Sequence, residues 1–142
     1  MDLSGKKHVF VYGTLMKGMG NEHVIASFPH ENFPATVSNV DMFNVGSFPA
    51  LVKGTHSYHG ELVVFDPSVD ETMLYAYMDR LEGYHKDRES ESMYLRVPIT
   101  VCVNGEQVET EVYLWNYSLN GLKFIDPAMF KSYREFVAAR NW

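Results

Sequence analysis

The chain has 142 residues, of which 46% are hydrophobic and 14% aromatic, and it carries a formal net charge of −6 at pH 7. A chain of this length buries about two-thirds of its unfolded surface, so residues 1–142 are expected to form a single domain with one core. Nucleic acids and anionic membranes are disfavoured as partners, because the chain is acidic and has no block of Lys or Arg. A small molecule is the expected partner, and the oligomeric state stays open.

Cys102 is the single cysteine, which excludes an internal disulfide and favours the reducing cytoplasm as the location. The apolar run near the N-terminus is too short for a signal peptide or a membrane span. His56 and His59 lie on an expected strand at a spacing that does not put both rings on one side, and no Cys or carboxylate pattern completes a zinc site. We therefore expect no metal site at these histidines.

A run of β-branched and aromatic residues from Val9 to Tyr12 predicts a short strand that leads directly into a turn at Gly13. Glycine can adopt backbone conformations that are closed to other residues. Successive N–H groups around Thr14 and Leu15 can then point at one bound group, for which a carboxylate is a natural candidate. From these residues alone, a ligand-binding loop and an ordinary strand-to-loop turn are equally supported.

Three further segments precede the middle of the chain. Residues 21–28 are expected to form a short helix that ends before Pro29, and residues 35–45 are expected to form a strand. Another strand over residues 58–65 ends before Pro67, because proline fixes the turn and has no N–H to donate.

A helix follows this turn. Ser68 and Glu71 stand three residues apart as in a capping box, and Gly83 provides the expected helix end. Apolar side chains recur between them at i, i+3, i+4 and i+7, which predicts one buried face: Leu74, Tyr77, Met78 and Leu81. Asp79 and Arg80 project away from this face and are expected to be solvated charges.

The clearest element is an antiparallel β-hairpin around Asn104 and Gly105, a pair that favours a tight turn. Apolar residues alternate on one face of the two strands: Val97, Ile99, Val101, Val103, Val108, Val112 and Leu114. Polar residues occupy the other face, which is expected to meet water: Thr100, Gln107, Glu109 and Glu111.

Asp126 and Pro127 are typical of a helix start and predict a C-terminal helix that packs over the sheet. Its apolar side chains are Met129, Phe130, Tyr133, Phe136 and Val137. Together the elements predict an α+β fold with a strongly curved sheet, since Gly46, Gly54 and Gly60 lie where bulges and bends are tolerated.

Glu82 is the strongest candidate for a catalytic group. On a helical wheel it lies roughly 40° beyond Met78, at the edge of the apolar face, just before the helix ends. Partial burial and the negative end of the helix dipole both raise the pKa of such a carboxyl group, toward the range of a general base. Periodicity alone favours a plainer alternative, a rim glutamate paired with a nearby basic side chain: Arg80, Lys86 or Arg96.

Five motifs follow one another at characteristic intervals. They are Tyr-Gly-Thr-Leu at residues 12–15 with Gly18 and Asn21 after it, Gly-Ser-Phe-Pro-Ala-Leu at 46–51, Tyr-His-Gly-Glu-Leu-Val at 58–63, Met-Asp-Arg-Leu-Glu-Gly-Tyr at 78–84, and Tyr-Leu-Arg at 94–96. This series resembles the γ-glutamylcyclotransferase-like family, which includes the γ-glutamylamine cyclotransferases and the plant AIG2-like proteins. The likeness covers about residues 8 to 117 of the chain.

The resemblance implies a small mixed barrel, closed or nearly closed, with an active-site cavity and one essential glutamate, which by its place in the motif corresponds to Glu82. It also implies a reaction without metal or cofactor, in which the α-amine of a γ-glutamyl compound attacks its own γ-carbonyl, forms 5-oxoproline and expels an amine. Glu82 would take the proton of the attacking amine and return it to the leaving nitrogen. The residues expected to bind the substrate are Tyr12, Gly13, Thr14, Leu15, Asn21, Gly46 and Tyr113. Tyr113 is equally suited to packing alone.

Two other functions fit the same residues. The protein could be a non-catalytic binding or interaction module, or an amide hydrolase in which Glu82 activates water. The charged segment 85–92 is expected to be a solvated loop, with a lid over the cavity as the alternative. The identity of the leaving amine is not readable from the sequence.

Overall fold

The structure is a computed structural model, and it describes residues 1–140 of the chain. The chain forms six strands, two α-helices and two 3-10 turns within these residues. In chain order the elements are β1 (His8–Val11), the 3-10 turn η1 (Glu22–Val24), β2 (His30–Asn44), β3 (Pro49–Phe65), α1 (Glu71–Glu82), the 3-10 turn η2 (Glu89–Glu91), β4 (Tyr94–Val103), β5 (Glu106–Trp115), β6 (Lys123–Phe124) and α2 (Tyr133–Arg140).

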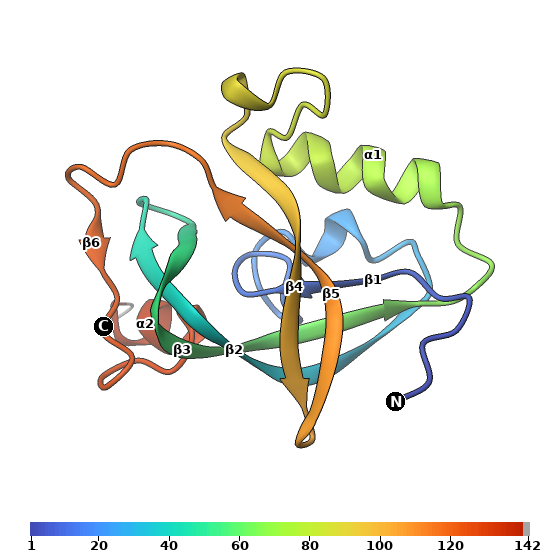
Figure 1. The fold of residues 1–142 in the computed structure, drawn as a ribbon, viewed down its shortest axis with the longest axis horizontal. Coiled ribbons are helices and arrows are strands. Elements are labelled where there is room, and N and C mark those ends of the chain that lie inside the picture. The colour runs from blue at the N-terminus through green and yellow to red at the C-terminus, as the bar shows by residue number, and fades with distance from the viewer. Residues whose placement is uncertain (141–142) are drawn as a thin grey trace.

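The strands form one six-stranded antiparallel sheet of the order β1–β3–β2–β4–β5, with β6 beside β2. β2 and β3 make a long hairpin that contains a bulge at Val40, which pairs with both Lys53 and His56. The β4–β5 hairpin crosses this pair steeply in Figure 1 and is paired with β2 only through Thr36 and Val37. Because the shared ladder is so short, the two hairpins run in different directions and the sheet is strongly curved.

The curvature brings the two edge strands, β1 and β5, toward each other. His8 Nδ1 lies 2.8 Å from Thr110 Oγ1, and the Tyr12 hydroxyl donates to the Tyr113 carbonyl at 2.6 Å. No ladder joins these two strands within residues 1–140, so the sheet stays open. The expected α+β fold with a strongly curved sheet is confirmed.

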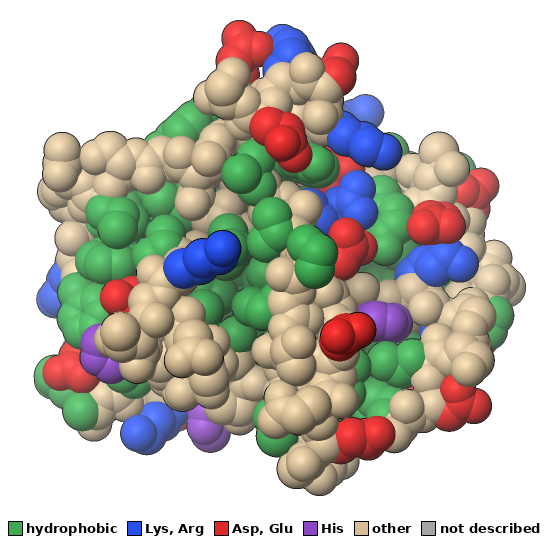
Figure 2. Space-filling view, viewed as in Figure 1, with side chains coloured by type: hydrophobic (Ala, Val, Ile, Leu, Met, Phe, Trp, Pro, Cys, Tyr) green, Lys and Arg blue, Asp and Glu red, His purple; other side chains and the backbone are tan. Residues whose placement is uncertain are grey.

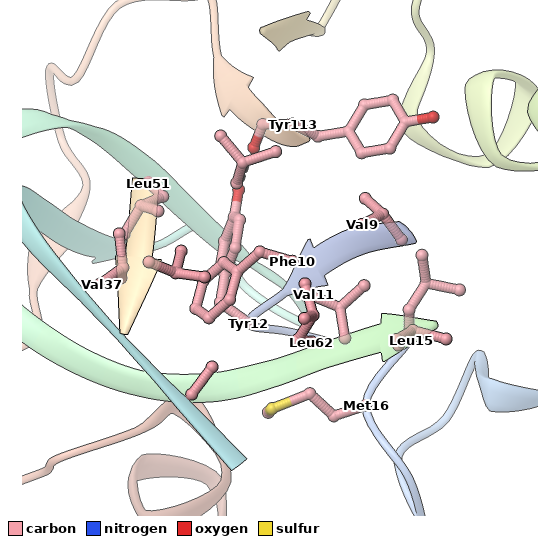
Figure 3. Packing of buried hydrophobic residues seen from close by; sticks show 14 of the residues in the cluster. Val9, Phe10, Val11, Tyr12, Leu15, Met16, Val37, Leu51, Leu62 and Tyr113 are labelled. Atoms are coloured by element: carbon pink, nitrogen blue, oxygen red, sulfur yellow. Dashed lines mark hydrogen bonds between the residues drawn. The ribbon is translucent and has the colours of Figure 1, made fainter. Parts of the chain in front are cut away.

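The core fills the concave side of this sheet. Figure 3 shows Phe10, Val11 and Leu62 packed together, with Tyr12 reaching toward the backbone of Tyr113. The expected alternation of the β4–β5 hairpin is clearest toward its turn, where these side chains are buried: Val101, Val103, Val108 and Val112. None of the helices in residues 1–140 combines the length and the apolar character needed to cross a membrane.

The expected helix is present as α1, but its details differ. Asp70 is the N-cap, because its carboxylate accepts from the Met73 N–H at 3.2 Å, so the predicted cap at Ser68 is wrong. Gly83 ends the helix as expected, in the left-handed conformation at a φ of 66°. Tyr77 is 43% exposed rather than buried, because the face of α1 that packs on the sheet is centred on Leu74 and Met78.

Several expected boundaries are also wrong. The strand expected from residue 35 begins at His30, since the edge of β2 is free of β4 before Thr36 and tolerates a proline. The expected helix over residues 21–28 is only the short turn η1. The C-terminal helix begins at Tyr133, because Asp126 closes a separate turn in which its carboxylate accepts from the Ala128 N–H at 2.9 Å.

The segment between α1 and β4 stands out at the top of Figure 1, and Figure 2 shows acidic and basic side chains clustered there. Its end is anchored, since Ser92 is fully buried and its hydroxyl oxygen accepts from the His85 N–H at 2.7 Å. Asn116, which directly follows β5, donates to the Ser92 carbonyl at 2.9 Å. The segment is therefore a charged, solvated loop with a fixed base.

Candidate active site

A cavity of about 400 Å³ opens where the end of β1, the β2–β3 turn, the last turn of α1 and the β4–β5 hairpin meet. Its lining includes Glu82 and six of the seven residues expected to bind substrate: Tyr12, Gly13, Thr14, Leu15, Asn21 and Tyr113. Gly46 is not part of the lining and forms an exposed turn instead, while its neighbour Ser47 faces the cavity. No residue of the segment 85–92 lines the cavity, so the lid alternative has no support.

The loop after β1 forms one wall. Its glycine is needed for space, because a Cβ atom at Gly13 would lie 2.7 Å from Pro49 Cγ. The expectation of an unusual backbone angle there is wrong, since Gly13 is not among the residues with positive φ. Within the described part of the chain, the N–H groups of Gly13, Thr14 and Leu15 donate to no protein acceptor. They are therefore free to bind an anion or a carbonyl oxygen of a ligand.

Asn21 holds this loop closed. Its backbone N–H donates to the Thr14 carbonyl at 2.8 Å, and its side-chain amide donates to the Thr14 hydroxyl at 2.9 Å. A second set of hydrogen bonds also holds this loop, and it was not predicted from the sequence. Arg134 of α2 donates to the Lys17 carbonyl at 2.6 Å and to Glu61 at 3.2 Å, while Glu61 accepts from the Lys17 N–H at 2.8 Å. Glu61 stands inside the motif at residues 58–63, which was the available signal, but the helix that supplies Arg134 is far away in sequence.

The opposite wall carries Glu82, the last residue of α1. Burial raises the pKa of its carboxyl group to about 7, and the charge of Asp79 adds to the effect. No basic side chain in residues 1–140 lies within ion-pair distance of Glu82. The alternative of a rim glutamate paired with Arg80, Lys86 or Arg96 therefore has no support from these contacts.

Three tyrosines complete the wall around Glu82. The hydroxyl groups of Tyr12, Tyr94 and Tyr113 donate to the Tyr113 carbonyl, the Pro49 carbonyl and the Asp79 carboxylate, respectively. Burial, with the charge of Glu82 as a further cause, raises the pKa of all three. The tyrosines thus stay protonated, and the wall near Glu82 is neutral apart from Asp79. Tyr94 was not expected in the site, although it begins the Tyr-Leu-Arg motif.

Asp79 is not the solvated charge that the helical wheel predicts. Its side chain is 21% exposed and pairs with Arg96 of β4 at 3.2 Å. The wheel describes only the helix, whereas the β4–β5 hairpin brings Arg96 and Tyr113 to this side of it. Arg80 is exposed, as expected.

No group of three or more His, Cys, Asp or Glu side chains in the described residues could hold a metal ion. His56 instead contacts Asp41 at 2.6 Å, outside the cavity.

The family model described as "Gamma-glutamyl cyclotransferase, AIG2-like" matches residues 9–132. The chain belongs to this family. Membership implies cyclotransferase activity and the binding of small γ-glutamyl substrates. The match extends beyond residue 117, where the sequence resemblance ended, and reaches the turn before α2.

Solved structures share the fold at low identity. An uncharacterised protein from Pyrococcus horikoshii is 17% identical with a TM-score of 0.63, over 96% of this chain and 99% of that one. A protein from Arabidopsis thaliana is 22% identical with a TM-score of 0.59, over 98% and 85%. The allophanate hydrolase of Kluyveromyces lactis is 14% identical with a TM-score of 0.62, over 95% of this chain but only 21% of the enzyme. No curated protein matches the sequence.

Proposed function

We propose that the protein is a cyclotransferase that releases 5-oxoproline from a γ-glutamyl amine or a γ-glutamyl amino acid. One observation carries the proposal: a single carboxylate with a pKa raised to about 7, Glu82, shares a cavity with a loop of unpaired backbone N–H groups. The loop suits a negatively charged or carbonyl oxygen, and the carboxylate suits an amine. A γ-glutamyl group presents both.

In the proposed reaction the substrate's α-amine attacks its own γ-carbonyl carbon. The new C–N bond closes the five-membered ring, and the C–N bond to the leaving amine breaks. Glu82 accepts one proton from the attacking nitrogen and passes it to the leaving nitrogen, so it ends the cycle ionised. The substrate supplies nucleophile and electrophile, so the proposed chemistry needs no metal or cofactor.

The loop would contribute by fixing the substrate. The N–H groups of Gly13, Thr14 and Leu15 would bind the α-carboxylate or the carbonyl oxygen, and this holds the amine near the γ-carbon. Apolar side chains from the other walls restrict water and so favour ring closure over hydrolysis: Phe48, Pro49, Leu81 and Met93. The single cysteine is consistent with a place in the cytoplasm, which we propose as the location.

A product screen tests the proposal. The purified protein is incubated with γ-glutamyl amines, γ-glutamyl dipeptides and ε-(γ-glutamyl)-lysine, and the products are identified by mass spectrometry. We expect 5-oxoproline together with the free amine, and no 5-oxoproline above background from the Glu82→Gln variant. Free glutamate in its place would identify an amide hydrolase. Binding without turnover of any compound would identify a binding module.

A further inference from the structure

A network of three charged side chains, Asp79, Arg96 and Glu111, extends from α1 through β4 to β5 beside Glu82. Arg96 lies between two carboxylates, with Asp79 at 3.2 Å and Glu111 at 3.4 Å. The side chains of Arg96 and Asp79 are only 16% and 21% exposed. The Arg96 guanidinium also lies 4.1 Å from the ring centre of Tyr75, whose hydroxyl donates to Glu111 at 3.1 Å. These contacts fix Arg96 from several directions.

Asp79 connects this charged network to the cavity in two ways. It precedes Glu82 by three residues on α1, a spacing at which two side chains are neighbours on the helix surface. It also accepts the hydroxyl hydrogen of Tyr113, whose ring lines the cavity. Figure 3 shows that ring extending away from the core cluster, with its hydroxyl at the far end.

We propose that Asp79 and Arg96 are positioning residues that set the proton affinity of Glu82 with opposite signs and hold Tyr113 in the cavity wall. The negative charge of Asp79 disfavours the ionised form of Glu82 and so strengthens its hold on a proton. Arg96 compensates part of that charge and keeps Glu82 from becoming too weak an acid to ionise near neutral pH. The catalytic consequence rests on the function proposed above.

The groups that face Glu82 come from four elements. Asp79 lies on α1, Tyr12 follows β1, Tyr94 lies on β4 and Tyr113 on β5. The three tyrosines are neutral because burial raises the pKa of each, so Asp79 is the charged neighbour of Glu82 in the described chain. Arg96 acts through Asp79. If the ion pair served only to hold the structure, loss of either Asp79 or Arg96 would disrupt the same contact and should shift the pKa of Glu82 in the same direction.

Two charge-removing variants test this idea. Asp79→Asn keeps an acceptor for the Tyr113 hydroxyl and should lower the pKa of Glu82 by about half a unit to one unit. Arg96→Gln removes the compensating charge and should raise it by a similar amount. The titration of the ¹³C-labelled Glu82 carboxyl group is followed by NMR, and the pH profile of kcat/KM is recorded beside it.

Arg80→Gln is the matched control. It removes the same charge two residues from Glu82, but from an exposed side chain that makes no ion pair within residues 1–140. Solvent screening should leave the titration of Glu82 almost unchanged. Arg96→Lys keeps the positive charge, so the pKa of Glu82 in this variant should stay close to the wild-type value. If Arg96→Gln unfolds, Arg96→Lys replaces it as the informative variant. A shift of about one full unit in the pKa of Glu82 would then count against the charge effect.

Opposite shifts for Asp79→Asn and Arg96→Gln support the inference, whereas shifts of the same sign, or none, overturn it. The NMR titration needs no substrate, so it separates this inference from the proposed function. Opposite NMR shifts without any 5-oxoproline release would leave the coupling standing and reject the cyclotransferase. Release of 5-oxoproline with unchanged titrations would do the reverse.

Discussion

The two walls of the cavity are built on different physical principles. The loop wall, residues 12–15, offers backbone N–H groups whose direction is set by hydrogen bonds to Asn21 and by the ion pair of Glu61 and Arg134. The helix wall offers a titratable side chain, Glu82, whose pKa depends on burial and on Asp79. Backbone dipoles do not titrate, whereas a carboxylate does. In the proposed reaction, substrate binding and proton transfer therefore lie on separate elements, and we expect that each can be changed without the other.

The largest effect is expected on the helix wall. Glu82→Gln keeps the shape of the side chain but removes the base, so kcat should fall by about 10²–10⁴-fold while KM changes only a few-fold. Steady-state kinetics with the best γ-glutamyl substrate measure both. A variant that keeps more than about a tenth of wild-type kcat would contradict the assignment of Glu82 as the acid–base group.

On the loop wall the expected loss is in binding. Gly13→Ala places a Cβ atom 2.7 Å from Pro49 Cγ, so the loop and the β2–β3 turn must move apart. We expect 5-oxoproline or a γ-glutamyl analogue to bind about 10-fold more weakly or worse, with overpacking costing about 1–3 kcal/mol of stability. Gly20→Ala is the control, because Gly20 also lines the cavity and a Cβ there meets nothing within 4 Å. Calorimetry that finds equal affinity for both variants would remove the loop as the binding wall.

The pH dependence should follow the helix wall alone. Glu82 must be ionised to act as a base, so kcat/KM should rise with pH through about 7 and then level off. Because the folded state binds the Glu82 proton more tightly than the unfolded state, the group stabilises the fold fully below 4.5, and this contribution is lost as pH rises to about 7.

This loss is measurable by denaturation. The free energy of unfolding of Glu82→Gln minus that of wild type should be about 1–3 kcal/mol larger at pH 8 than at pH 4. If the stability difference between the two proteins is the same at both pH values, Glu82 is not perturbed in the folded state. Such a result would reject the desolvated-base interpretation independently of the kinetics.

The smallest effect is expected at the outer fastening of the loop. Arg134→Ala removes the donor that holds the Lys17 carbonyl and Glu61, so the loop should loosen and KM should rise by about 3- to 10-fold with little change in kcat. Lys131→Ala is the control, because it removes an exposed positive charge just before α2. A fall in kcat with unchanged KM would mean that Arg134 supports the helix wall instead.

Local patterns predicted part of the fold well. The Asn104–Gly105 hairpin and the end of α1 at Gly83 follow from turn chemistry that involves only neighbouring residues. The predicted cap of α1 and the predicted start of α2 were wrong. Asp70 caps α1 by accepting from the Met73 N–H, and Asp126 accepts from the Ala128 N–H in a turn that precedes α2. The predicted strands begin at residues 35 and 58, whereas β2 and β3 begin at His30 and Pro49. The predicted starts are too late because pairing with the neighbouring strand, and not the local residues, decides how far a strand continues.

The sequence by itself determined which residues are available for chemistry: a glycine loop after the first strand, a glutamate at the end of a helix, and the motif order that identifies the family. Only the tertiary structure decided what surrounds them. Asp79 became a half-buried neighbour of Glu82, and Arg134 became part of the loop wall, through contacts that span 17 and 117 residues of sequence. Periodicity reports the face of one element, whereas the electrostatic environment of a carboxylate is the sum over every element that packs against it.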